Sequence, residues 1–60
     1  MQLYKIKEVA EILAVSERQV YIYMDSGRLA FLKLSTGARR ITREDLEQFV
    51  QDCKSEANNV

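Results

Sequence analysis

The first half of the chain carries two apolar stripes with helical spacing. The first stripe follows the i, i+3, i+4, i+7 pattern of one helix face, at Ile6, Val9, Ala10 and Leu13. The pattern breaks at Ala14-Val15. A second stripe then runs along the segment 17–26, at Val20, Tyr23 and Met24. Gly27 follows and tolerates the left-handed backbone of a helix end. These features predict two short helices that share one apolar seam across a tight turn, which is a helix-turn-helix.

Polar residues mark where these two helices begin. Ser16 is followed three residues later by Gln19, which is the spacing of a capping box. The Ser hydroxyl accepts from the third helical amide, and the Gln side chain reaches back. The first helix starts less favourably, because Lys5 stands where a Ser or Thr cap is expected, although Glu8 lies near the positive end of the helix dipole. Residues 3–4 predict an extended lead-in or a hydrophobic staple onto this helix.

The segment from Gly27 to Ile41 has strand character. Its first apolar run comprises Leu29, Phe31, Leu32 and Leu34. The run breaks at residues 35–37, which include Gly37, and resumes over 38–41. Two short runs around a glycine-containing loop predict a β-hairpin, which must pack against helices because two strands alone are marginal. We expect Leu32, Leu34 and Ile41 to face inward. The exposed side then carries Lys33 and Arg39, and a hairpin beside a helix-turn-helix is a wing.

The remainder of the chain predicts a third helix and a tail. Thr42 is a good cap, with Asp45 three residues later. Apolar positions recur with helical spacing at Leu46, Phe49, Val50 and Cys53. Cys53 is most simply a small buried hydrophobe. The predicted fold is mainly α with a small β-hairpin, a winged helix-turn-helix of order α-α-β-β-α over residues 1–54. Residues 55–60 are expected to form a polar, disordered C-terminal tail.

The second helix of a helix-turn-helix can enter a DNA major groove, so the residues on its outward face are candidates for DNA contact. Arg18 can donate two hydrogen bonds to guanine, and Gln19 can pair with adenine, although the cap competes for Gln19. Tyr21 either gives its hydroxyl to a phosphate or belongs to the core. Ile22 offers an apolar contact, for instance to a thymine methyl group. Asp25 either repels a phosphate or holds Arg28 or a lysine in place.

Basic residues outside the second helix are further candidates for DNA contact. Wings run along the phosphates or enter the minor groove, where arginine is favoured, so Arg39 and Lys33 are candidates. The alternative for Arg39 and Arg40 is a solvated strand end or a pair with an acid of the last helix. Arg40 is the better candidate for a structural role, because it abuts Ile41 and the acidic helix start. Lys5 and Lys7 either contact phosphates or serve only surface solubility.

The charge is unevenly distributed although the net charge is zero. Through Arg43 there are eight Lys or Arg against four Asp or Glu, about +4, and from Glu44 onward one Lys stands against five acids, about −4. The basic residues up to Arg43 either form one basic face or are simply spread over the solvated surface.

Length and composition narrow the class of protein. Sixty residues allow one domain with a small core. The single cysteine forms no internal disulfide, which fits a reducing compartment, and no apolar run approaches membrane-spanning length. These features predict a soluble, cytoplasmic protein.

The composition argues against catalysis. The chain has no His and a single Cys, so imidazole chemistry and a multi-thiolate metal site are excluded. No glycine-rich phosphate loop is present, and a chain of this size has little room for a catalytic pocket. We therefore expect no enzyme activity, no cofactor and no metal.

Three segments, KEVAEILAVSERQVY, SGRLAFLKL and RRITREDLEQFV, resemble the excisionase-like family of small DNA-binding proteins, which belong to the MerR-like winged helices. The resemblance covers residues 4–50. It implies a protein of a bacterium, phage or mobile element, with the second helix in the major groove and the wing on the minor groove or backbone. Relatives bend DNA, bind cooperatively at attachment sites and bias an integrase towards excision, and others are small transcriptional regulators.

The resemblance also assigns residues and partners. It implies DNA contacts by the helix and the wing, namely Ser16, Arg18, Gln19, Tyr21, Lys33 and Arg39. Arg40 matches a position that is commonly Arg. Ile22 and Asp25 stand where relatives often carry a basic residue, and Lys5 replaces the usual cap. The implied partners are double-stranded DNA, an integrase and further copies of the chain on DNA, without a membrane.

Three functions remain open from the sequence. The first is a sequence-preferring DNA-binding protein of excisionase type. The second is a small transcriptional regulator. The third is a protein-interaction module in which Tyr21, Ile22 and the acidic third helix form a docking face.

Overall fold

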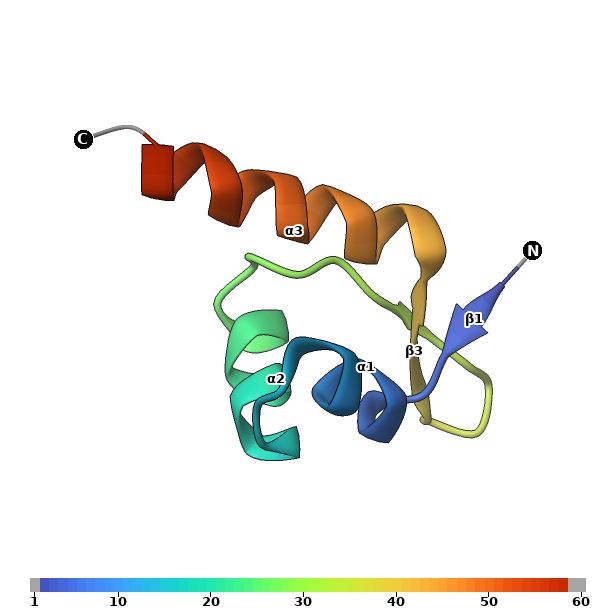
Figure 1. Cartoon of the computed structure of the whole chain (residues 1–60). Coiled ribbons are helices and arrows are strands. Elements are labelled where there is room, and N and C mark those ends of the chain that lie inside the picture. Colours follow the sequence, from blue (N-terminus) through green and yellow to red (C-terminus); the bar gives the residue numbers. More distant parts are fainter. Residues whose placement is uncertain (1, 59–60) are drawn as a thin grey trace.

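Three helices and three short strands make up residues 2–58, the part of the chain that the computed structural model describes. The elements are β1 (Leu3–Tyr4), α1 (Ile6–Leu13), α2 (Glu17–Asp25), β2 (Leu32–Lys33), β3 (Arg39–Thr42) and α3 (Arg43–Asn58). Figure 1 shows the short helices α1 and α2 together on one side of the molecule, with the longer α3 running across them from β3 to beyond α2. The predicted winged helix-turn-helix is confirmed, with β1 added before the first helix.

The turn between α1 and α2 follows from local backbone chemistry. α1 ends at Ala14, which adopts the left-handed conformation with φ 57°. The N–H of Val15 donates to the carbonyl of Ala10 at 3.0 Å and closes the helix end. α2 then begins at Ser16, whose hydroxyl accepts from the N–H of Gln19 at 3.1 Å. The predicted break and the Ser16 cap are both confirmed.

The start of α1 is stabilised from within the helix. The carboxylate of Glu8 accepts from the N–H of Lys5 at 3.0 Å. This is the reciprocal half of a capping box, and a lysine side chain has no acceptor for the other half. Glu8 thus supports a helix start that lacks a Ser or Thr cap.

The sheet is antiparallel, with β3 in the middle and the order β1-β3-β2. The predicted extended lead-in is therefore a strand, in which Leu3 opposes Thr42. The hairpin is shorter than predicted, because β2 comprises only two residues. Its turn is closed by the N–H of Leu34, which donates to the carbonyl of Ala38 at 2.8 Å. Gly37 supplies the positive φ of 92° that this turn needs.

The strand register corrects the predicted facing of the hairpin residues. Lys33 opposes Arg39, and directly opposed residues point to the same side of a sheet. By alternation Ile41 shares that side, whereas Leu32 lies on the other. Ile41 is fully buried, as predicted, and Leu32 is half-buried. The prediction was wrong for Leu34, which is 37% exposed because the strand ends before it.

One core takes up the apolar stripes of all three helices. Its buried members are Ile6, Val9, Ala10, Val20, Met24, Leu29, Ile41, Leu46 and Phe49. The rings of Tyr23 and Phe49 lie 4.8 Å apart between centroids and join α2 to α3. Leu29 enters this core from the loop after α2 rather than from a strand. Cys53 is half-buried against the core, close to the predicted role of a small hydrophobe.

The third helix is longer than the sequence predicted. Thr42 accepts from the N–H of Asp45 at 3.0 Å, which confirms the cap, but the helix continues to Asn58. The expectation of a disordered tail over 55–60 was therefore wrong for 55–58, and residues 59–60 lie outside the described part. Nη2 of Arg28 donates to both carboxylate oxygens of Glu56 at 2.6 Å, which ties this last turn to the loop after α2. This hydrogen bond and the charge of Glu56 raise the pKa of Arg28.

Candidate nucleic-acid interface

The second helix exposes one stripe of side chains on the face opposite to its core residues. Val20 and Met24 are buried, whereas Arg18 and Asp25 are exposed. Tyr21 and Ile22 lie between them and are 42% and 47% exposed. These spacings of three, four and seven residues place the exposed side chains along one helix face. Tyr21 is thus a surface residue, so the core alternative for it was wrong.

Arg39 connects this stripe to the wing. Its Nη1 lies 3.1 Å from Oδ1 of Asp25. Its guanidinium carbon lies 5.4 Å from the ring centroid of Tyr21 and 4.7 Å from that of Phe31. Both distances are within the range of cation–π attraction. Arg39 therefore contacts both α2 and Phe31, the residue directly before β2. Asp25 holds this arginine rather than Arg28 or a lysine.

The two adjacent arginines of β3 have different surroundings. Arg40 is half-buried, and its Nη1 donates to the carbonyl of Arg39 at 2.8 Å. Among residues 2–58 no acid of α3 pairs with Arg40, so the pairing considered for it was wrong. The sequence favoured Arg40 as the structural arginine, yet Arg39 makes the ion pair and both ring contacts. The reason is the register, which turns Arg39 towards α2.

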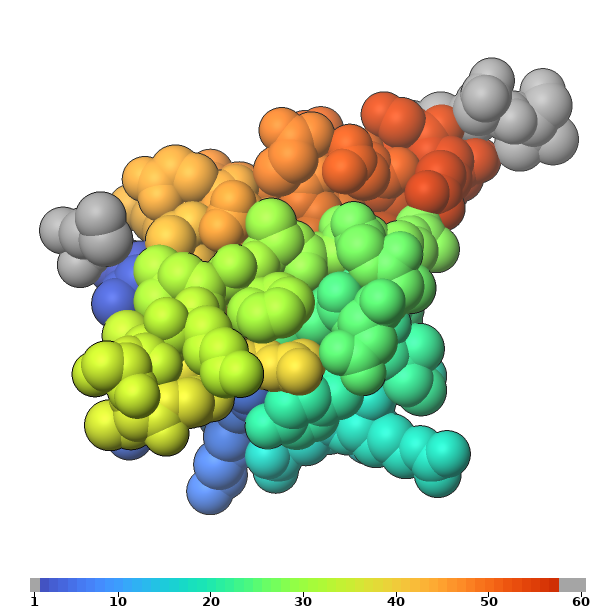
Figure 2. Space-filling model, turned by 180° about the vertical axis from the view of Figure 1, so that it is seen from behind, coloured from blue at the N-terminus to red at the C-terminus, as the bar shows by residue number. Residues whose placement is uncertain are grey.

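Lys33 completes the basic side of the hairpin. It is exposed and lies directly opposite Arg39. Like charges in opposed positions destabilise a sheet, and Asp25 offsets this repulsion by pairing with one of them. Figure 2 shows the hairpin (lime and yellow) and α2 (teal) reaching the same face of the molecule, with α3 (orange) along the opposite edge.

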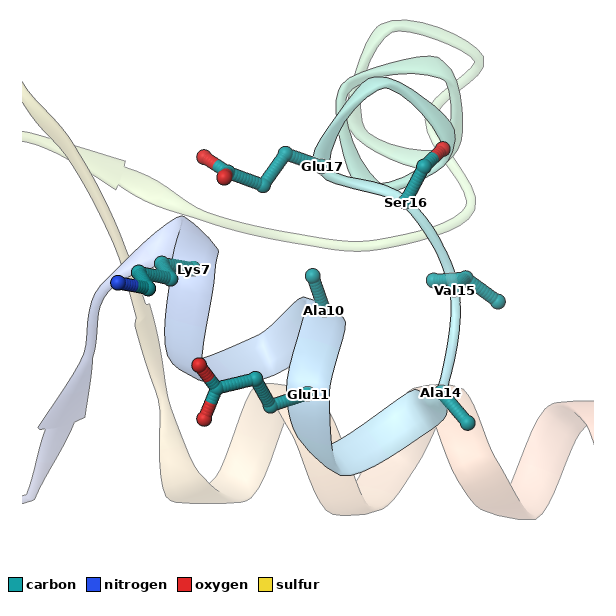
Figure 3. Close-up of a pocket in the computed structure, with 7 residues that line it drawn as sticks. All are labelled: Lys7, Ala10, Glu11, Ala14, Val15, Ser16 and Glu17. Carbon is teal, nitrogen blue, oxygen red and sulfur yellow. The ribbon is translucent and has the colours of Figure 1, made fainter.

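Lys5 caps α1 and Lys7 lies in its first turn, and both are exposed. Lys7 also lines an open hollow of about 370 Å³ between α1 and the start of α2. The lining residues are Lys7, Ala10, Glu11, Ala14, Val15, Ser16 and Glu17. Figure 3 shows the side chains of Lys7, Glu11 and Glu17 extending to the same side of this hollow. Two carboxylates beside one ammonium group do not favour an anion, so the hollow itself is no phosphate site.

Sequence reasoning missed the partners of Arg39. Asp25 lies 14 residues from Arg39, and the only signal for their pairing was opposite charge. Phe31 was predicted only as a member of an apolar strand run, and no local pattern indicated its contact with a guanidinium group. Both contacts depend on how the hairpin packs against α2.

The comparison with protein families decides the class of this fold. The family model of a helix-turn-helix domain matches residues 3–54. The chain belongs to this excisionase-like helix-turn-helix family. The match begins in β1 and ends within α3, so it includes both helices of the motif and the wing. A comparison with curated proteins gave no significant match, and neither did one with solved structures.

Membership in the family gives the function in outline. The chain is a small helix-turn-helix protein that binds DNA, and its family is typically not enzymatic. Within residues 2–58, no helix is both long enough and apolar enough to span a bilayer.

Proposed function

We propose that this helix-turn-helix protein is a sequence-preferring DNA-binding protein of excisionase type. It binds attachment-site DNA and biases the integrase of a phage or mobile element towards excision. The observation that carries the proposal is the exposed stripe of α2, which lies beside the basic wing and is joined to it through Arg39. A helix of this kind reads base edges, while a wing beside it positions the protein on the backbone.

The proposal gives each element of the interface a role. α2 enters the major groove, where Arg18 donates to guanine and Ile22 packs against a thymine methyl group. Tyr21 reaches a phosphate with its hydroxyl. Gln19 takes part in the cap only through its backbone N–H, so its half-buried side chain has a share in reading adenine.

The wing and the start of α1 supply the remaining contacts. Arg39 and Lys33 follow the backbone or the minor groove. Arg40, Lys5 and Lys7 have a secondary share, as further positive charges near phosphates, and Ser16 holds the start of α2 in place for the approach. Further copies of the chain bind neighbouring sites on the same DNA.

A binding assay with a matched control tests the proposal. Wild-type protein is titrated onto the DNA that flanks its own gene and onto a scrambled duplex, beside an Arg18→Ala/Arg39→Ala variant. The control is Arg43→Ala/Lys54→Ala, which removes the same number of positive charges from exposed positions of α3. We expect wild type and control to prefer the flanking DNA and the first variant to lose this preference. Absence of DNA binding at low salt, with a stable protein partner recovered instead, contradicts the proposal and supports a protein-interaction module.

The same binding geometry also suits a small transcriptional regulator. An excision assay separates the two functions, since only the first requires the protein to change the direction of recombination. Integrase and attachment-site DNA are incubated with and without the protein, and excised product is measured. A repressed or activated reporter without any change in excision favours the regulator.

A further inference from the structure

Arg39 is held in place by groups from two other parts of the fold. Asp25 and Tyr21 lie on α2, and Phe31 precedes β2. The side chain of Arg39 is only 29% exposed, although a long side chain at the start of a strand can extend its charged end into water. The contacts with Asp25 and the two rings therefore select one orientation of this side chain.

This orientation couples the wing to the second helix. Within residues 2–58, the bond from Arg39 to Asp25 is the only side-chain hydrogen bond between α2 and the hairpin. The hairpin itself is small, since β2 has two residues, and a short ladder does little to fix its angle to the helices. Besides the burial of Ile41 in the core, this ion pair and the contact of Arg39 with Tyr21 hold the wing against α2.

Asp25 has an opposite effect on affinity. Its side chain is 68% exposed on the same helix face as Arg18, seven residues along. A carboxylate on a face that meets DNA repels phosphates, which weakens binding to every duplex. Asp25 thus lowers the affinity for every duplex while it orients the wing. Such a residue favours discrimination between DNA sequences over the strength of binding.

We propose that Asp25 is a positioning residue that sets how well this domain discriminates its own site from other DNA. The inference rests on the proposed DNA-binding function. Asp25 holds Arg39 at a fixed offset from Arg18, so that α2 and the wing meet the duplex as one unit. A duplex whose groove and backbone do not match this offset is bound less well.

The variant Asp25→Asn tests this role, because it keeps the shape of the side chain and removes its charge. The dissociation constant for a scrambled duplex should fall roughly twofold to threefold, since one repulsive charge is lost. The ratio of the scrambled to the own-site dissociation constant should fall about fivefold to tenfold, since Arg39 loses its ion pair and is held less firmly. A purely electrostatic role would tighten both duplexes equally, and a loss of folding would weaken both.

Three further variants separate positioning from charge. Glu17→Gln removes an acid from the same helix without touching Arg39, and it should leave the ratio unchanged. Asp25→Glu keeps the charge and should restore most of the discrimination. In an Arg39→Gln background, Asp25→Asn should change the ratio no further. Thermal unfolding of each variant, monitored by circular dichroism, identifies a temperature at which all variants are folded, and binding is measured at that temperature.

The outcomes distinguish this inference from the proposed function. If the wild type prefers its own site and Asp25→Asn keeps the full ratio, the inference is overturned while the proposed function stands. An equal drop in Glu17→Gln overturns it as well, because charge alone then explains the effect. A wild type that binds neither duplex overturns both.

Discussion

Arg18 and Arg39 are both arginines on the face that we assign to DNA, but their surroundings differ. Arg39 is bound to a carboxylate and lies against two rings. Arg18 is exposed, and within residues 2–58 no carboxylate pairs with it. A guanidinium group without a partner keeps all its donors available for a base edge. At the scale of single residues, Arg18 is therefore suited to reading bases and Arg39 to positioning.

Replacing Arg18 by Ala should weaken binding to the own site and relax base preference. A bidentate contact to guanine is worth on the order of 1–3 kcal/mol of discrimination. Fluorescence anisotropy with own-site and scrambled duplexes measures both affinities, and Lys54→Ala serves as the charge-matched control on α3. An equal loss on every duplex would instead make Arg18 a phosphate contact.

The second helix is too short to be stable by itself. It has nine residues, and isolated helices below about 12–15 residues are marginal in water. Its stability therefore depends on the Ser16 cap at one end and on the packing of Val20 and Met24 along one side. At the scale of elements, the cap and this packing together determine how well the exposed stripe of α2 is ordered.

Replacing Ser16 by Ala should lower the free energy of unfolding by about 0.5–2 kcal/mol, because the N–H of Gln19 loses its acceptor. Urea denaturation followed by circular dichroism measures the change. Ser55→Ala is the control, since Ser55 is exposed within α3 and Ala suits a helix at least as well. Similar losses in both variants would show that the cap contributes nothing.

The whole molecule has a small core, in which each buried side chain contributes a large share of the stability. A 60-residue domain buries a modest fraction of its surface, so its net stability is only a few kcal/mol. Leu29 closes the core from a loop and is 1% exposed. Loop residues are usually tolerant of change, but this one is a core residue.

Replacing Leu29 by Ala should cost about 2–5 kcal/mol, which is enough to unfold much of the population. The matched control is Leu34→Ala, the same substitution at a position that is 37% exposed, and it should cost far less. Thermal unfolding measures both. Equal effects would contradict the assigned burial.

The separation of charge along the chain also belongs to the whole molecule. The acidic residues after Arg43 lie in α3, away from the face that presents α2 and the wing (Figure 2). If about four basic side chains reach phosphates, log affinity should fall with log salt with a slope of roughly −3 to −4. A series of binding isotherms at increasing KCl concentration measures the slope. A slope near zero contradicts a phosphate interface.

Much of this protein was determined by its sequence, because the deciding interactions are local. The stripes of α1, α2 and α3 have helical spacing, and the caps at Ser16 and Thr42 involve residues three apart. The break at Ala14 and the turn at Gly37 likewise depend on neighbouring residues. Such local patterns can be recognised from the sequence alone, and they predicted the helix-turn-helix and its wing.

Only the tertiary structure decided which side chains meet across the fold. Arg39 was predicted to face outward but lies towards Asp25, 14 residues away. The direction of such a side chain depends on the strand register, because a shift of one residue exchanges the two faces of a strand. The last turns of α3 contact Arg28 through Glu56 over 28 residues, and no local pattern extended the helix that far. These contacts depend on the relative placement of elements, which packing sets and local periodicity does not.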